Sequence, residues 1–172
     1  TTAVLLIFCV KENIRGEEKS GNISSSGEII FILDTRASMN AQDRDREAID
    51  AIRQAVYSLP SDYRVGLVAY NTDIQTVIVP GTPAAQMEEM LAGITYTGYT
   101  NAGEGLAQAV GLFSESGASD RCIVMLTDGE IDMPDSRARE ASRALYSEAA
   151  LQARERGVRM YIVAIGTELS DP

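Results

Sequence analysis

EIIFILDTRAS, residues 28–38, is the stretch of sequence that indicates the fold. Residues 28–33 are rich in isoleucine and apolar at successive positions, which is typical of a short strand buried on both faces of a sheet. Polar residues follow at once, from Asp34 to Ser38. In open parallel sheets, binding sites lie at the carboxyl ends of the strands. We therefore expect a central parallel strand that leads directly into a functional loop.

Strand-like and helical segments alternate along the rest of the chain. Strand-like runs cover residues 64–70, 74–79, 121–127 and 158–165, and helical patterns cover 43–59, 82–94, a segment around 106–113 and about 134–156. The short polar connection at 71–73 predicts a hairpin, which makes the strand 74–79 antiparallel to its neighbour. Strands that alternate with amphipathic helices imply βαβ units. The predicted fold class is α/β, a doubly wound and mostly parallel sheet with one antiparallel edge strand and helices on both faces.

The chain length of 172 residues suits a single domain. We expect this domain in residues 28–172, after an N-terminal strand and linker in residues 1–27. Residues 3–10 are apolar but far shorter than the ~20 residues that span a bilayer, so we interpret them as a strand. One hypothesis is that this strand covers an exposed edge of the sheet. At residue 82 we expect Thr82 to cap a helix whose first position is Pro83.

Composition and charge exclude several classes of function. The chain has 25 acidic and 15 basic residues, a formal net charge of −10. This excess disfavours binding to nucleic acid or to anionic lipid, and we expect no membrane insertion within the chain. The chain also contains no histidine. Catalysis by a Ser-His or Cys-His pair and metal binding by histidine are therefore excluded.

Oxygen-bearing side chains lie in three separate loops at one edge of the predicted sheet. Asp34 and Ser38 come after the first strand, Thr100 precedes the third helix, and Asp128 follows the strand 121–127. Carboxylates and hydroxyls without sulfur or imidazole are hard ligands, which suit Mg²⁺, Mn²⁺ or Ca²⁺ rather than zinc or copper.

Three short runs carry a resemblance to a known family. FILDTRASM, YTNAGEGL and MLTDGE resemble, in this order, the three motifs of the metal-ion-dependent adhesion site of the von Willebrand factor type A family. The resemblance extends from residue 28 to about 168. It implies a Rossmann-like fold and a site in which Asp34, Ser38, Thr100 and Asp128 hold Mg²⁺, or else Mn²⁺ or Ca²⁺. It also implies that a carboxylate of a partner protein completes the shell of the ion.

Arg36 departs from the family pattern, because it stands where the family has its first ligand serine. A guanidinium has no lone pair to offer and is always charged, so it cannot be a metal ligand. Two interpretations remain open at this point. Either Arg36 turns outward and a weakened site keeps its ion, or Arg36 occupies the site, pairs with Asp34 or Asp128, and the domain binds without metal.

The resemblance favours a non-enzymatic module that binds a protein ligand at the ends of the strands. Tyr99 and Glu130 are candidates for ligand contact there, with packing and solvated surface as the alternatives. Two other functions remain as alternatives: a scaffold or regulatory domain of a larger assembly, and a metal-dependent phosphatase-like hydrolase that uses Asp34. We expect this domain to be part of a larger protein that lies outside the cell or at its surface. The family usually continues beyond the strand 158–165, so either this domain is truncated at its C-terminal end or a closing segment has been lost.

Overall fold

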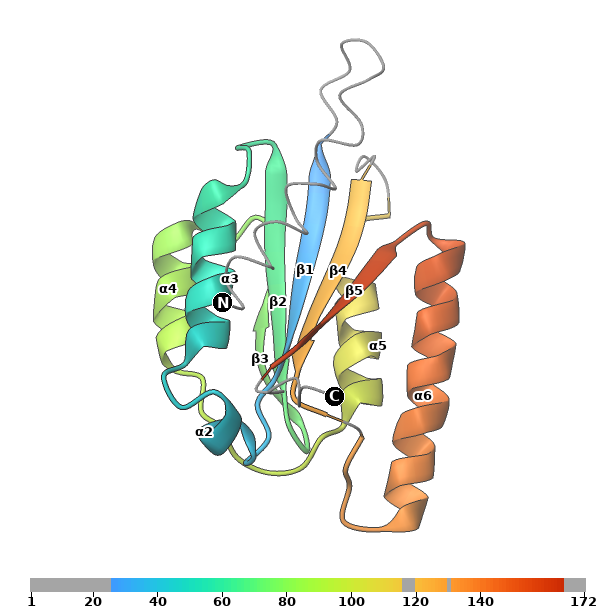
Figure 1. The fold of residues 1–172 in the computed structure, drawn as a ribbon. Helices are drawn as coiled ribbons and strands as arrows, with labels where there is room; N and C mark the ends of the chain where they lie inside the picture. The colour runs from blue at the N-terminus through green and yellow to red at the C-terminus, as the bar shows by residue number, and fades with distance from the viewer. Residues whose placement is uncertain (1–25, 116–119, 130, 166–172) are drawn as a thin grey trace, which may run out of the picture.

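The computed structural model describes residues 26–115, 120–129 and 131–165, and these form one mixed sheet covered by helices (Figure 1). Its five described strands are β1 (Gly27–Asp34), β2 (Tyr63–Tyr70), β3 (Ile74–Ile78), β4 (Asp120–Thr127) and β5 (Arg159–Ala164). They lie in the order β3-β2-β1-β4-β5, and only the β2–β3 pair at one edge is antiparallel. The predicted fold class is confirmed, and β1 is the central strand.

Helices cover both faces of the sheet, as predicted. They are α2 (Met39–Gln42), α3 (Glu47–Ser58), α4 (Ala84–Ala92), α5 (Ala102–Leu112) and α6 (Ser136–Glu155). In Figure 1, α3 and α4 lie on one side of the sheet and α5 and α6 on the other. Alternate residues of β1 explain this arrangement: Phe31 belongs to the core cluster with α3 and α4, and Ile32 belongs to the cluster with α5 and α6. Both side chains are fully buried.

Two predicted helix starts were wrong, because polar side chains near them bond differently. The helix expected from residue 43 begins at Glu47, since both carboxylate oxygens of Asp43 accept hydrogen bonds from Ala48 N at 3.2 Å. Thr82 does not cap α4: its hydroxyl donates to Val79 O at 2.8 Å, and the helix begins at Ala84. By contrast, the start predicted for the longest helix holds, with Asp135 accepting a hydrogen bond from Ala138 N.

The helices α5 and α6 touch closely where α5 begins. Gly103 N donates a 3.1 Å hydrogen bond to the buried hydroxyl of Ser142 in α6. A Cβ atom on Gly103 would collide with the carbonyl oxygen of Ser142, which is backbone and cannot rotate away. The absence of a side chain at Gly103 therefore allows the two helices to come this close.

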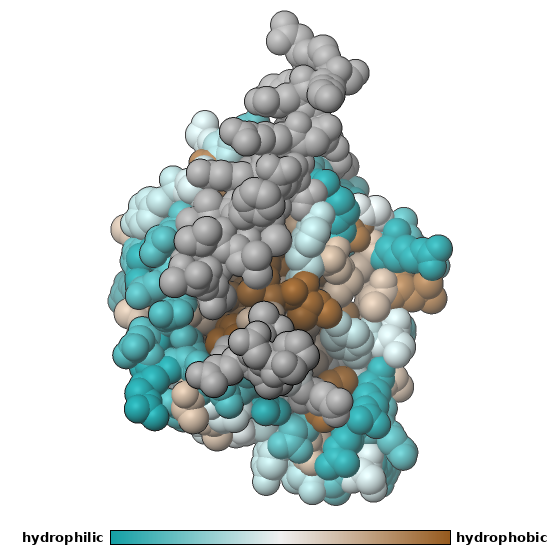
Figure 2. Space-filling model, in the orientation of Figure 1, coloured by the Kyte–Doolittle hydropathy of each residue, from teal (hydrophilic) through white to brown (hydrophobic). Residues whose placement is uncertain are grey.

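Hydrophobic and hydrophilic residues occupy different parts of the face shown in Figure 2. Figure 2 shows hydrophobic residues gathered in the middle of one face, with hydrophilic residues over the elements on either side. None of the helices in the described segments is both long and apolar enough to cross a membrane. The strand predicted at residues 3–10 and the linker up to residue 25 lie outside the described residues.

Candidate functional site

The loops that follow β1 and β4 meet the loop that precedes α5 at the carboxyl edge of the sheet (Figure 1). Backbone hydrogen bonds hold them together: Thr97 N donates to Thr35 O at 2.7 Å, Ala37 N to Gly98 O at 3.1 Å, and Thr100 N to Asp132 O at 2.6 Å. We call this surface the strand-end rim and define it as residues 34–38, 95–101, 128–129 and 131–133. The rim is thus fixed by main-chain bonds and does not depend on side-chain contacts alone.

Asp34, the last residue of β1, is the innermost residue of the rim and is fully buried. One carboxylate oxygen accepts from Arg36 N at 3.1 Å, and the other accepts from the hydroxyl of Thr127 at 2.8 Å. Burial raises the pKa of Asp34 from its ordinary 3.8 to about 6. The two hydrogen bonds and the charge of Arg36 lower this pKa, and the nearby carboxylate of Asp128 raises it. The cost of removing the charged carboxylate from water is therefore larger than the stabilisation that its hydrogen bonds and Arg36 provide, and the pKa stays raised.

The side chain of Arg36 points into the site. Its Nε lies 2.9 Å from Asp128 Oδ1 and donates a short hydrogen bond to Ser38 Oγ. Its Nη1 donates to the hydroxyl of Thr100 at 3.5 Å. The Arg36 side chain is 21% exposed, whereas that of Asp128 is 1% exposed. The guanidinium therefore lies between the three loops and neutralises a buried carboxylate.

Ser38 and Asp128 complete the network around this guanidinium. The hydroxyl of Ser38 accepts from Arg36 and donates to Asp128 Oδ2, so its proton and a lone pair are both in use. Asp128 Oδ1 forms the ion pair with Arg36, but the contact lacks the alignment of a hydrogen bond. The carboxylate is therefore held by one aligned hydrogen bond and by charge. We call Arg36, Ser38, Thr100 and Asp128, with Asp34 behind them, the arginine cluster.

Most side chains predicted for the site meet in this cluster. Asp34, Ser38, Thr100 and Asp128 come together, and Arg36 lies among them. Tyr99 is 44% exposed at the rim, so it is placed for contact with a ligand. Glu130 lies outside the described residues. The roles of all these residues as metal ligands or ligand contacts stay predictions.

The residues of the cluster do not fit the divalent cation that the family resemblance implies. An ion bound by Ser38, Thr100 and Asp128 would occupy the space that the Arg36 guanidinium fills. Two like charges would then share one small site. In the described part of the chain, no group of three or more Asp, Glu, Cys or His side chains is placed to hold a metal ion.

Sequence reasoning missed Thr127, the last residue of β4. Its hydroxyl donates to Asp34 at 2.8 Å and accepts a hydrogen bond from Gly129 N at 3.2 Å. The parallel pairing of β1 and β4 places Thr127 beside Asp34. The signal was present, because Thr127 directly precedes Asp128 in the third motif, but strand register cannot be read from one sequence.

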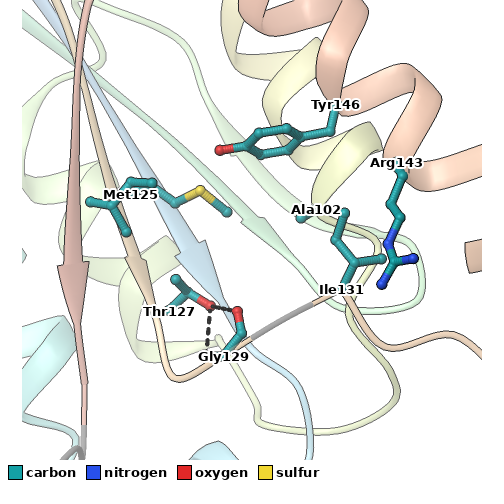
Figure 3. Close-up of a pocket in the computed structure, with 8 residues that line it drawn as sticks. Ala102, Met125, Thr127, Gly129, Ile131, Arg143 and Tyr146 are labelled. Carbon is teal, nitrogen blue, oxygen red and sulfur yellow. Dashed lines mark hydrogen bonds between the residues drawn. The ribbon is translucent and has the colours of Figure 1, made fainter.

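A pocket of about 340 Å³ opens beside the cluster (Figure 3). It lies between α6 and the strands β4 and β5, and its lining includes Gly129 and Ile131 of the rim. Its wall is mostly apolar, with Ile162 on β5 62% exposed. Arg143 and Tyr146 of α6 line one side of it, as Figure 3 shows. The remaining lining residues are Ala102, Met125 and Thr127.

Comparison with known proteins agrees with this architecture. The family model described as the von Willebrand factor type A domain matches residues 29–130. A search of curated proteins found no match. Among solved structures, the chain is similar to an aerotolerance-related membrane protein from Bacteroides fragilis, with 22% identity and a TM-score of 0.64 over 84% of this chain and 74% of that one.

Two further structures share the fold. BatB, a conserved hypothetical protein from Bacteroides thetaiotaomicron, is 26% identical, with a TM-score of 0.62 over 78% of this chain and 64% of that chain. The vWF domain of the type V pili tip protein Mfa5 from Porphyromonas gingivalis is 21% identical, with a TM-score of 0.56 over 63% of this chain and 39% of that chain. The chain thus spans less than two thirds of the length of these two structures. Because the family model covers more than half of the sequence, the chain belongs to the von Willebrand factor type A domain family.

Proposed function

We propose that this domain is a non-enzymatic protein-binding module, which recognises its partner at the strand-end rim. The observation that carries the proposal is that the pocket and the arginine cluster lie side by side and share one rim. A partner would place an apolar side chain in the pocket and a carboxylate near the guanidinium groups of Arg36 and Arg143. Such a site combines an apolar anchor with a few polar contacts, as protein-recognition sites do.

The local charge at the rim supports this choice of ligand. The chain as a whole carries a net charge of −10, which would repel an acidic partner. Arg143 is exposed at the pocket, and within the described residues its guanidinium has no recorded ion pair or hydrogen bond. An acidic side chain of a partner would therefore have a favourable contact at Arg143, beside the pocket.

The similar solved structures also support a binding role at the cell surface. One similar structure is the vWF domain of a type V pili tip protein and another is a membrane protein. In line with these relatives, we propose that this domain works at the cell surface as part of a larger protein. These likenesses are too distant to transfer a ligand, and the partner is proposed from the chemistry of the rim. A scaffold role within an assembly would use the same surface.

Enzymatic use of Asp34 is disfavoured by its surroundings. A nucleophilic carboxylate must be reachable by substrate, yet Asp34 is fully buried and both its oxygens accept hydrogen bonds from the protein. We expect no hydrolysis of p-nitrophenyl phosphate above background, with or without Mg²⁺, Mn²⁺ or Ca²⁺. Turnover that disappears in Asp34→Ala would contradict the proposal and favour a phosphatase-like enzyme.

Site-specific photo-crosslinking in the cells that produce the protein tests the binding surface. A photoreactive phenylalanine at Tyr99 should capture a protein partner, whereas the same group at Tyr57 should not. Tyr57 is a matched control, because it is a tyrosine that is 67% exposed near the far end of α3. Equal capture from both positions would mean that the rim is not the binding surface.

Once the partner is captured, Tyr99→Ala should weaken its binding by about 5–30-fold, the usual loss for an aromatic contact residue. Arg143→Glu should weaken it at least as much, because it reverses the charge beside the pocket. Tyr57→Ala should change the dissociation constant by less than about twofold. Isothermal titration calorimetry would measure all three, with urea unfolding to show that each variant stays folded.

A further inference from the structure

We propose that the Arg36 guanidinium is the permanent cation of the strand-end rim, so that the site works without metal, and that Arg36→Ser alone turns it into a site for a divalent ion. This inference does not depend on the identity of the partner. It can therefore fail while the binding function stands, or hold while that function fails.

Charge balance is the first support. Asp34 and Asp128 bring two carboxylates into a region where their side chains are almost fully buried. Buried carboxylates are stable only beside a cation or with a full set of hydrogen bonds. Among the described residues, Arg36 forms an ion pair with Asp128 at this site. The side chain of Arg36 thus supplies the positive charge that the cluster requires.

The position of the guanidinium is the second support. The atom closest to Ser38 and Asp128 is Nε, not a terminal nitrogen, so the head group is held within the cluster rather than resting on it. The loop geometry explains this: Arg36 N is bonded to Asp34, and the next residue, Ala37, is bonded to Gly98 O. With its backbone fixed at the edge of the site, the side chain reaches the three oxygen-bearing residues over a short path.

The oxygen atoms that surround the guanidinium are the third support. The hydroxyls of Ser38 and Thr100 accept from it, and Asp128 balances its charge. These are hard oxygen donors of the type that Mg²⁺, Mn²⁺ and Ca²⁺ prefer. If residue 36 were serine, it would add a third hydroxyl and remove the positive charge. The carboxylates of Asp34 and Asp128 would then lack a neighbouring positive charge, and a bound divalent ion would supply it.

The decisive test compares Mn²⁺ and Mg²⁺ binding to five forms of the protein by isothermal titration calorimetry and by thermal unfolding. The wild type should show no saturable binding up to about 1 mM ion, the weak end of the range for protein sites. Arg36→Ser should bind with a dissociation constant of about 0.1–1 mM and unfold at a higher temperature when the ion is present. Arg36→Ser combined with Asp128→Asn should lose this binding.

Arg44→Ser is the matched control, because it changes the net charge equally at an exposed arginine in the turn before α3. It should behave as the wild type. Ion binding by Arg36→Ser no tighter than by Arg44→Ser would overturn the inference. The wild type decides the question even if Arg36→Ser fails to fold: saturable Mn²⁺ binding that Asp128→Asn removes would show that the site is a metal site despite Arg36, and its absence would support the proposal.

Discussion

Gly103→Ala is expected to lower the free energy of unfolding by about 3 kcal/mol or more. Its added methyl group would collide with the carbonyl oxygen and carbonyl carbon of Ser142, both backbone atoms of α6. Relief requires that one helix move, and overpacking of this kind typically costs about 1–3 kcal/mol, more where backbone must shift. The hydrogen bond from Gly103 N to Ser142 Oγ would be strained as well. Urea unfolding followed by circular dichroism measures the loss.

Gly111→Ala provides the control within the same helix. A Cβ atom at Gly111 meets nothing within 4 Å, so alanine should stabilise the protein by about 0.5–1 kcal/mol through helix propensity. The opposite signs of the two substitutions separate the helix contact from a general effect of alanine. If Gly103→Ala were as stable as the wild type, α5 and α6 would not approach as closely as described.

The same substitution should disturb the rim. Asn101 caps α5 by accepting a hydrogen bond from Glu104 N, and Thr100 directly precedes it. A shift of α5 away from α6 would therefore displace Thr100 from Arg36 Nη1. We expect Gly103→Ala to weaken partner binding as well as stability, whereas Gly111→Ala should leave binding unchanged.

Asp34→Asn is expected to raise stability at neutral pH, which is unusual for a buried polar residue. The pKa of Asp34 is about 6 in the folded protein against an ordinary 3.8, chiefly because the carboxylate is buried. The folded state thus holds the proton more tightly than the unfolded chain does. The stability that this group contributes is fully present below pH 3.8 and is lost as the pH rises through about 6, by roughly 3 kcal/mol in total.

Asparagine removes this loss and keeps the hydrogen bonds. Its oxygen would accept from Arg36 N, and its amide group would donate to Thr127 Oγ1, which would then donate to Gly129 O. The gain is reduced because Arg36 loses one neighbouring negative charge. We therefore expect Asp34→Asn to be more stable than the wild type by about 1–3 kcal/mol at pH 7.5 and nearly equal to it at pH 4.

Urea unfolding between pH 4 and pH 8 measures this difference, and the chain has no histidine to titrate in that window. Asp62→Asn is the control, because Asp62 is exposed in the turn before β2 and its loss should matter by less than about 0.5 kcal/mol. A variant Asp34→Asn that is less stable than the wild type at pH 7.5 would mean that the charged carboxylate is favoured by its neighbours.

The fold could be predicted from the sequence because its buried strands are continuous apolar runs, whereas its helices repeat apolar residues with a helical period. The run at residues 28–33 lies within β1, and the predicted hairpin is the antiparallel β2–β3 pair. The helix starts at residues 43 and 82 were harder, since one carboxylate and one hydroxyl decide them through bonds that periodicity does not contain.

The candidate site could be predicted in position but not in its internal arrangement. The order of the strand-end residues placed Asp34, Ser38, Thr100 and Asp128 together. Whether Arg36 turned outward or inward could not be decided, because the direction of a long side chain depends on the contacts that the folded loops offer it. Thr127 was missed for a similar reason, since its partner Asp34 is known only from the register of β1 and β4.

The central position of β1 also dictates when the site can form during folding. Thr35 bonds to Tyr70, 35 residues later, whereas Asp34 bonds to Thr127 across 93 residues. Contacts across such separations close large loops and form slowly. A growing chain can pair β1 with β2 early, but Asp34 can bond to Thr127 only after β4 has been added. We therefore expect the rim to form late in folding, so that its capacity to bind would report that the two halves of the sheet have joined.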